Sequence, residues 1–144
     1  MILTKTYEID YAHRLQHHEG KCKNVHGHTA KITVSFEGPV NGHTGMILDF
    51  GNFSWLRDIV RELDHTIILC LSDPIRKLLI DYNIKEHSDR INILTLGSVP
   101  TAENIISYLA LKIRTFIENL EIKDFCLRQI SFEETPGNII TSKY

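Results

Sequence analysis

The chain has 144 residues, about the length of one ordinary domain and enough to fold without a disulfide or a structural metal. Its 42% hydrophobic and 24% charged residues are typical of a globular protein and exclude a disordered one. A net charge of −2 argues against binding of duplex nucleic acid through a broad basic face. The longest apolar run, Ile67 to Leu71, is far too short to cross a membrane.

The N-terminus and the cysteines indicate a compartment. Met1 leads directly into alternating polar and apolar residues, so the sequence predicts no signal peptide. Cysteine occurs at three scattered positions, 22, 70 and 126. An odd and sparse set without a secretory signal is typical of reduced thiols. We therefore expect a cytoplasmic protein with no membrane partner.

Two long strands are predicted first, from the alternation of apolar and polar residues. In residues 2–13 the inner face carries Leu3, Tyr7, Ile9, Tyr11 and His13. In residues 26–37 it carries His26, His28, Ala30, Ile32, Val34 and Phe36. A period of two is that of a half-buried strand, and the simplest arrangement is an antiparallel pair joined by a loop.

Two helices follow from spacings of three and four residues. Asp49 is a suitable N-cap for a helix that extends to about Leu63, with apolar residues at positions 53, 56, 60 and 63. Pro100 and Thr101 mark the start of the strongest helix. Its apolar stripe consists of Ile105, Leu109, Ile113, Phe116 and Leu120.

The middle and the end of the chain complete the predicted topology. Between Leu63 and Val99 the pattern is weak, although Asp73-Pro74 indicates a short helix and residues 90–96 a short strand. Residues 125–134 alternate again, and a turn over 135–138 leads to a last strand over 138–143. The sequence therefore predicts one α+β domain over 1–144, in the order ββ-α-α-ββ. Two helices would pack on one face of a four-stranded antiparallel sheet.

The histidines give the most specific chemical signal, because five of the eight lie between positions 13 and 28. His26 and His28 are two residues apart on a strand, so their imidazoles project from the same face, and His13 ends the preceding strand on its own inner face. Three neutral imidazoles with a fourth position left open are typical of a catalytic zinc. Two alternatives remain open. The histidines could be strand-end residues in contact with water, or Cys22 could be a fourth ligand that closes a structural site.

Other residues have side chains suited to acid–base chemistry. Cys22 is either an ordinary loop thiol or, beside zinc and two lysines, a thiolate able to take a proton or attack. Asp64 can fix the tautomer of His65 and make it more basic, although an acid beside an exposed histidine at a helix end is the simpler interpretation. Glu134 shares the phase of the inward-facing residues of its strand, and a buried carboxylate needs a donor partner.

The loop over 13–23 is locally basic in a chain that is acidic overall. It is either a solvated loop or a cradle for a phosphorylated substrate. Its basic residues are Arg14, His17, His18, Lys21 and Lys23.

Taken in order along the chain, these motifs resemble one family. They are Tyr11-Ala12-His13-Arg14-Leu15, Cys22-x3-His26-Gly27-His28, Thr44-Gly45-Met46-Ile47-Leu48-Asp49-Phe50, Leu63-Asp64-His65, Pro100-Thr101-Ala102-Glu103-Asn104 and Glu134-Thr135. The set is similar to that of 6-pyruvoyltetrahydropterin synthase and 6-carboxytetrahydropterin synthase, and it covers nearly the whole chain. The resemblance implies the tunnelling fold, in which trimers form a twelve-stranded barrel and two trimers stack into a homohexamer.

The resemblance also implies roles for individual residues. His13, His26 and His28 would bind zinc, Cys22 would be the catalytic thiol, and Asp64 with His65 would form the dyad that works with it. Glu134 would anchor the pterin by pairing with the N–H groups of its guanidine-like edge. Thr101 and Glu103 match a Thr-x-Glu that lies near the pterin pocket in relatives, although a helix cap and a first-turn acid explain them equally well.

The resemblance favours one reaction among the family's activities. The C-x3-HGH spacing is that of the enzymes of the queuosine pathway, whereas the animal pyruvoyl enzymes resemble C-x5-HGH. We therefore expect a zinc lyase that converts 7,8-dihydroneopterin triphosphate to 6-carboxy-5,6,7,8-tetrahydropterin. The alternatives are a 6-pyruvoyltetrahydropterin synthase and a pterin- or metal-binding relative without catalysis. Nucleotide binding is disfavoured because the sequence has no glycine-rich phosphate loop.

Overall fold

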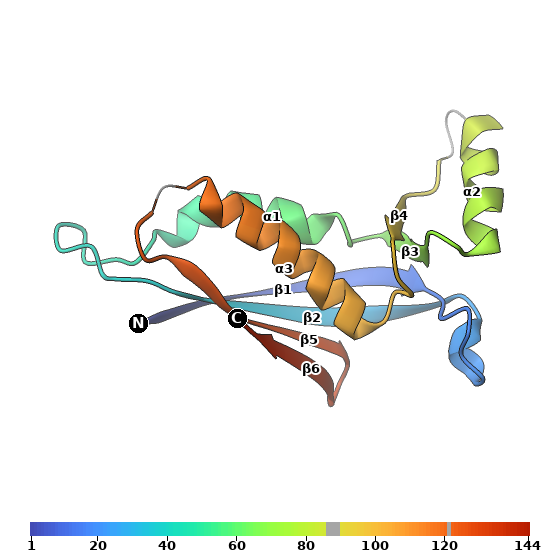
Figure 1. The fold of residues 1–144 in the computed structure, drawn as a ribbon, viewed down its shortest axis with the longest axis horizontal. Helices are drawn as coiled ribbons and strands as arrows, with labels where there is room; N and C mark the ends of the chain where they lie inside the picture. Colours follow the sequence, from blue (N-terminus) through green and yellow to red (C-terminus); the bar gives the residue numbers. More distant parts are fainter. Residues whose placement is uncertain (86–89, 121) are drawn as a thin grey trace.

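A computed structural model describes residues 1–85, 90–120 and 122–144. Its centre is a mixed sheet of six strands, in the order β4-β3-β1-β2-β5-β6 (Figure 1). The central pair is β1 (Ile2–His13) and β2 (His26–Glu37), antiparallel along their full length from Ile2 opposite Glu37 to His13 opposite His26. This confirms the two predicted strands and places their histidines at the same end of the pair.

The four antiparallel strands follow the prediction closely. Beside β2 lies β5 (Cys126–Thr135), and beside β5 lies β6 (Asn138–Lys143), both antiparallel to their neighbours. The turn between them contains Gly137 with φ +86°, a left-handed conformation that glycine adopts without steric cost. These strands form one continuous antiparallel half of the sheet.

The predicted four-stranded sheet is wrong in its strand number. Two further strands, β3 (Thr66–Cys70) and β4 (Ile93–Leu96), extend the sheet beyond β1, and both run parallel to their neighbours. No strand is expected over 66–70 from the sequence, because a short apolar run has no period that distinguishes a strand from a buried helix. The strand predicted over residues 90–96 is present in shortened form as β4.

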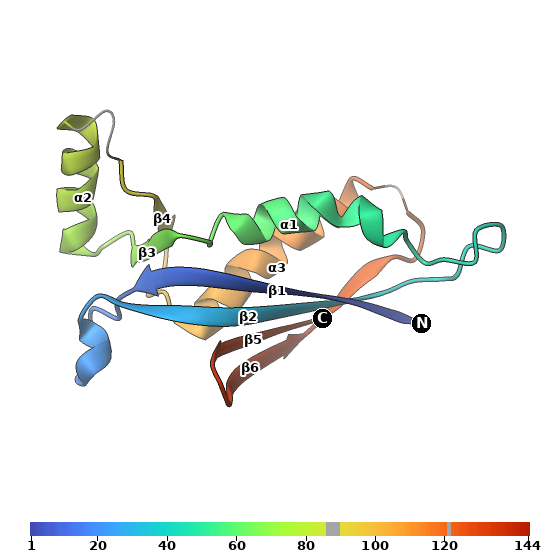
Figure 2. The ribbon, with the colours of Figure 1, turned by 180° about the vertical axis from the view of Figure 1, so that it is seen from behind.

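Two helices cover one face of the sheet, as predicted (Figure 2). The first begins as a 3-10 turn over Phe50–Phe53, where the Asp49 side chain accepts from Gly51 N, and continues as α1 (Ser54–Arg61). The second, α3 (Ala102–Glu118), is capped by Thr101. Their apolar sides pack on the inner face of the sheet to form the core. Its largest fully buried side chains include Phe36, Phe53, Phe132, Ile32, Leu56, Leu63, Ile105, Leu109 and Ile113.

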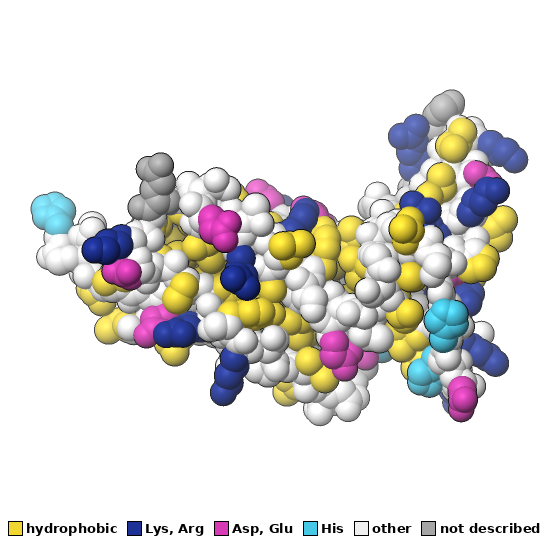
Figure 3. Space-filling model, viewed as in Figure 1, with side chains coloured by type: hydrophobic (Ala, Val, Ile, Leu, Met, Phe, Trp, Pro, Cys, Tyr) yellow, Lys and Arg dark blue, Asp and Glu magenta, His cyan; other side chains and the backbone are white. Residues whose placement is uncertain are grey.

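A third α-helix corrects the predicted order of ββ-α-α-ββ. Helix α2 (Pro74–Lys85) lies between β3 and β4 and projects from the body of the molecule (Figure 1). It starts where Asp73-Pro74 indicated a short helix. It has no buried residue, and Leu78 and Ile84 are 67% and 64% exposed. Figure 3 shows hydrophobic and basic side chains together on this projection.

Helix length also bears on membrane association. Within the described residues, every helix is too short or too polar to cross a membrane.

Candidate functional site

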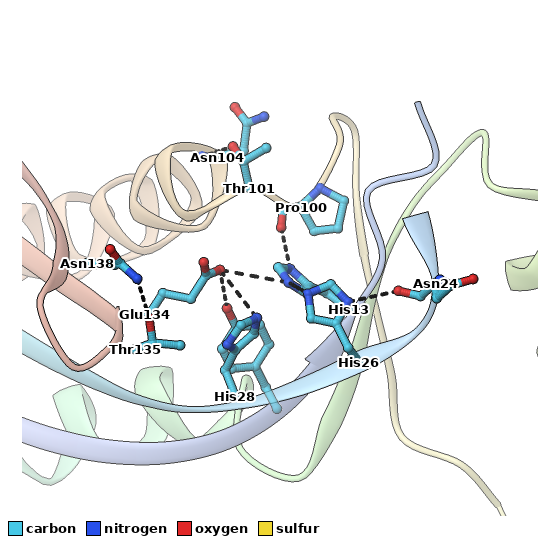
Figure 4. A network of polar contacts seen from close by, with 11 residues as sticks. His13, Asn24, His26, His28, Pro100, Thr101, Asn104, Glu134, Thr135 and Asn138 are labelled. Carbon is cyan, nitrogen blue, oxygen red and sulfur yellow. Dashed lines mark hydrogen bonds and ion pairs between the residues drawn. The ribbon is translucent and has the colours of Figure 1, made fainter. Parts of the chain in front are cut away.

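Three imidazoles meet at the end of the β1–β2 pair (Figure 4). His13, His26 and His28 each offer a ring nitrogen, and these nitrogens lie within 4.8 Å of one another. The rings of His13 and His26 have centroids 4.6 Å apart, and that of His28 lies 5.0 Å from His13. The antiparallel register accounts for this cluster, because His13 lies directly opposite His26 and His28 is two residues further along the same face.

Backbone carbonyls determine which nitrogen of each ring faces the centre. His13 Nδ1 lies 2.7 Å from the carbonyl oxygen of Pro100, and His26 Nδ1 lies 2.8 Å from that of Asn24. A carbonyl only accepts, so we assign the proton of both neutral rings to Nδ1. Each Nε2 is then left with a free lone pair, which is the form of histidine that binds metals.

The Nε2 atoms that face the centre of the cluster do not face hydrogen-bond donors. The Nε2 atoms of His13 and His26 lie 3.1 Å apart, so two lone pairs face each other, and the buried Nε2 of His28 has no hydrogen-bond partner among the described residues. Two nitrogens on a tetrahedral zinc, with bonds of about 2.0–2.1 Å, are about 3.3 Å apart. The residues present therefore fit a metal ion held by three imidazoles.

Burial favours the neutral form of two of the three ligands, His13 and His28. His13 is 1% exposed, and the loss of solvation lowers its pKa despite the opposing effects of the Pro100 carbonyl and the Glu134 carboxylate. Burial likewise lowers the pKa of His28, again opposed by Glu134. A neutral imidazole is needed for metal coordination, so the surroundings favour binding at neutral pH.

Glu134 faces the same centre from strand β5 (Figure 4). Its Oε1 lies 3.8 Å from His13 Nε2 and 3.9 Å from His28 Nε2. It sits where the pairing of β5 with β6 shifts register, between Glu133 and Thr135. Such irregularities redirect side chains next to sites. The inward orientation predicted from the phase of Ile130 and Phe132 is confirmed.

Tyr11 also belongs to this site, although its sequence pattern predicted only an inward-facing strand residue with no role of its own. Its hydroxyl donates to Glu134 Oε1 at 2.9 Å, and its ring centroid lies 5.2 Å from that of His13 and 5.6 Å from that of His28. Burial raises the pKa of Tyr11, and the neighbouring carboxylate raises it further, so the hydroxyl remains a donor. Tyr11 is two residues before His13 on β1, so both side chains project from the same face. This spacing is the sequence signal that could have placed Tyr11 in the site.

A cavity of about 540 Å³ adjoins Glu134 and is within the usual size of a small-molecule pocket. Thr101 and Glu103, at the start of α3, line it together with Glu134, so the three predicted substrate-binding residues surround one space. The Thr101 side chain also accepts from Asn104 N, and its hydrogen bond to Glu103 lowers the pKa of that carboxyl. Thr101 therefore both caps α3 and lines the cavity.

Cys22 lies in a 3-10 turn (Lys21–Lys23) of the loop between β1 and β2. Its side chain is half-buried and the thiol is free. Among the described residues, the potential metal ligands are the three histidines without this sulfur. The structure therefore does not form the closed Cys-His₃ site, and a fourth position remains for another ligand.

Asp64 and His65 form a pair, and among the described residues their side-chain contacts do not include the three histidines. His65 Nδ1 lies 3.1 Å from Asp64 Oδ1, and the His65 ring is 75% exposed. The backbone N–H of Asp10 donates to Asp64 and is the main cause of a lowered Asp64 pKa, with His65 contributing further. His65 has φ 51°, which lets its own N–H donate to the Asp10 carbonyl while its ring turns to Asp64. A left-handed non-glycine residue is often found at functional sites.

Comparison with known proteins identifies the family. A family model described as 6-pyruvoyl tetrahydropterin synthase matches residues 2–143. The chain belongs to this family. A 6-carboxy-5,6,7,8-tetrahydropterin synthase of Rickettsia bellii is 30% identical over 139 residues, which cover 93% of this chain and 94% of the relative. The enzyme of the same name from Rickettsia conorii is 28% identical, with the same coverage.

Solved structures show the same fold. An uncharacterized protein from Wolinella succinogenes aligns with a TM-score of 0.80 at 23% identity, over 99% of this chain and 97% of that one. The 6-pyruvoyl tetrahydropterin synthase of Caenorhabditis elegans aligns with a TM-score of 0.70 at 24% identity, over 100% and 95% of the two chains. The predicted tunnelling fold is thus supported, with six strands in the described residues in place of the expected four.

Proposed function

We propose that this family member is a zinc-dependent lyase of queuosine biosynthesis. It would convert 7,8-dihydroneopterin triphosphate and one water molecule to 6-carboxy-5,6,7,8-tetrahydropterin, acetaldehyde and triphosphate. The observation that carries the proposal is the set of three imidazoles with inward lone pairs beside a cavity that holds the Glu134 carboxylate. The names of relatives that match over more than nine-tenths of this chain favour the 6-carboxy product.

The binding step would depend on Glu134. Its Oε1 already accepts from Tyr11, which holds the carboxylate in place, and the remaining lone pairs can accept from two N–H groups of the pterin ring. Thr101 and Glu103 would complete the wall around the ring. Lys21 and Lys23 of the 13–23 loop would help to neutralise the triphosphate, whereas Arg14 is paired with Asp73.

The chemistry needs protons to move between adjacent carbons of the substrate side chain. When bound, zinc on His13, His26 and His28 would supply a Lewis acid for the side-chain hydroxyls. Cys22 would take or give protons on one face of the side chain, and the Asp64–His65 pair on the other. An acid and a base on separate loops suit a reaction that isomerises and then fragments the side chain.

Product analysis tests the reaction. Purified, zinc-loaded protein is incubated with 7,8-dihydroneopterin triphosphate, and the products are identified by mass spectrometry. Acetaldehyde with a carboxylated pterin is the expected result. A pyruvoyl pterin would instead assign the second candidate, a 6-pyruvoyltetrahydropterin synthase that eliminates triphosphate and retains the side chain. Unchanged turnover in Cys22→Ala would remove the catalytic role of the thiol, and an inactive wild-type protein would favour a binding protein without catalysis.

A cytoplasmic homohexamer, built as a dimer of trimers, is the assembly that we propose. The separation of the exposed His65 from the buried His13 is compatible with a site shared between subunits, in which the Asp64–His65 pair serves a neighbour's zinc. Mixing of inactive Cys22→Ala and His65→Ala proteins after partial denaturation tests this arrangement. Recovered activity is expected, because some interfaces would then combine an intact thiol with an intact dyad.

A further inference from the structure

The turn that joins β3 to α2 contacts the loop that leaves the histidine cluster. Arg14 directly follows His13, and its Nε lies 3.1 Å from Asp73 Oδ2. Two residues further along, Gln16 Nε2 donates to Ser72 Oγ at 2.9 Å. Two successive side chains of the turn therefore contact two alternate side chains of the loop.

Asp73 is a rigid end of this connection. Its side chain is 0% exposed, and its Oδ1 accepts from Ile75 N at 2.9 Å, which caps the start of α2. Its backbone N–H donates to the Cys70 carbonyl at the end of β3. Arg14 is thus attached to a residue that is fixed by both a strand and a helix.

Leu15, which lies between Arg14 and Gln16, links this contact to Cys22. The backbone N–H of Leu15 donates to the Cys22 carbonyl at 2.9 Å, and Leu15 also lines the cavity beside Glu134. The position of Cys22 therefore depends on where Leu15 lies. Leu15 in turn is flanked by the two side chains that are held by the turn.

Stability is a weak explanation for the Arg14–Asp73 pair. Both facing atoms are buried, and within the part of the chain that the structure describes neither has an aligned hydrogen bond. The pair is therefore electrostatic, and its desolvation cost is only partly recovered. The histidines lie on β1 and β2 and are held by the register of these strands, and His13 is also held by the Pro100 carbonyl, which lies outside the loop. A change in the turn should therefore move the loop and leave the metal ligands in place.

We propose that the β3–α2 turn is a positioning element for Cys22. Asp73 and Ser72 act through Arg14 and Gln16 to fix Leu15, and Leu15 fixes the backbone of Cys22. The catalytic consequence rests on the proposed function, whereas the positioning of the thiol does not. This gives the segment inserted between β3 and β4 a role in the arrangement of the site.

The test uses Asp73→Asn, since the amide oxygen can still cap α2 while the charge that holds Arg14 is lost. Asp81→Asn, at an exposed position of the same helix, is the matched control. The rate of alkylation of Cys22 by iodoacetamide is followed by mass spectrometry of the peptide that contains it. Zinc content, kcat and KM are measured in parallel on the full chain.

In Asp73→Asn we expect alkylation of Cys22 to accelerate on the order of tenfold, as a held loop is released, and kcat to fall about 10- to 100-fold. Zinc content and KM should stay within about twofold of the wild type, as should every value for the control. Arg14→Lys keeps a positive charge opposite Asp73, so Cys22 in this variant should be alkylated more slowly than in Asp73→Asn. A purely structural role of Asp73 would not give this result.

Unchanged alkylation and kcat in Asp73→Asn would overturn the proposal, as would a loss of zinc equal to the loss of kcat. If Asp73→Asn does not fold, Gln16→Ala decides the matter, because it removes the contact with Ser72, together with a hydrogen bond to the neighbouring His17, and should also expose Cys22. If the wild-type protein does not convert the pterin substrate, the proposed function fails, and the alkylation rates alone still test the positioning of the thiol.

Discussion

The Nε2 atoms of His13 and His26 lie 3.1 Å apart although the opposite nitrogen of each ring faces a backbone carbonyl. Two neutral rings in this orientation present lone pairs to each other, an arrangement that a cation between them stabilises.

The first prediction concerns the metal. Wild-type protein should retain one zinc ion per chain after dialysis, and His28→Ala should retain almost none, because two imidazoles give an incomplete site. At free zinc 100 times above the dissociation constant, zinc should stabilise the wild type by about 2.7 kcal/mol, and a chelator should remove this increment. Zinc analysis and thermal unfolding measure both effects. His43→Ala, on an exposed loop, is the control, and full zinc content in His28→Ala would contradict the assignment.

The second prediction concerns the carboxylate of Glu134. In Glu134→Gln the amide can still accept from Tyr11, but it cannot accept two N–H groups from a pterin as a charged acceptor. The loss of charge-assisted hydrogen bonds of about 1.5–3 kcal/mol should lower kcat/KM roughly 10- to 100-fold, mainly through KM. Glu133→Gln, on the opposite face of β5, should leave the kinetics unchanged. A similar loss in both variants would mean that the strand, and not the carboxylate, is responsible.

The third prediction concerns pH and Asp64. The Asp10 N–H and His65 lower the pKa of Asp64 below its ordinary value of 3.8, so the unfolded chain binds a proton more readily. Asp64 should therefore stabilise the fold at pH values above about 4, and this contribution should vanish as pH falls through the lowered folded-state pKa.

Asp64→Asn tests the contribution through urea unfolding at several pH values. Because the carboxylate is about one-third exposed, the difference from the wild type should not exceed about 1 kcal/mol. Asp58→Asn, at an exposed position of α1, should show no such pH dependence. A difference that persists at acidic pH would show that the charge of Asp64 is not its source.

The fourth prediction separates the two roles of Thr101. Loss of its cap in Thr101→Ala should lower the free energy of unfolding by about 1 kcal/mol, whereas Thr101→Ser keeps the hydroxyl that accepts from Asn104 N. Chemical unfolding measures this difference, and KM reports the second role. A rise in KM that Ser reverses indicates contact of the hydroxyl with substrate. Equal destabilisation by Ala and Ser would contradict the capping role.

Much of the site was predictable because strand side chains alternate with a fixed period. That period alone places His13, His26, His28 and Glu134 on inward faces. The capping roles of Asp49 and Thr101 were also predictable, since each is a short polar residue that precedes an apolar stripe. The prediction was wrong about β3, where a run of apolar residues carries no period, and it therefore missed the parallel half of the sheet.

The sequence by itself determined which residue types face inward, and hence that imidazoles and a carboxylate share one side of the sheet. Only the tertiary structure decided that Glu134 meets Tyr11, 123 residues away, and that the Pro100 carbonyl orients His13. It also decided that Asp64 and His65 contact each other and the Asp10 backbone. The physical reason is that side-chain direction is a local property of the backbone, whereas contacts between distant strands depend on how the whole chain packs.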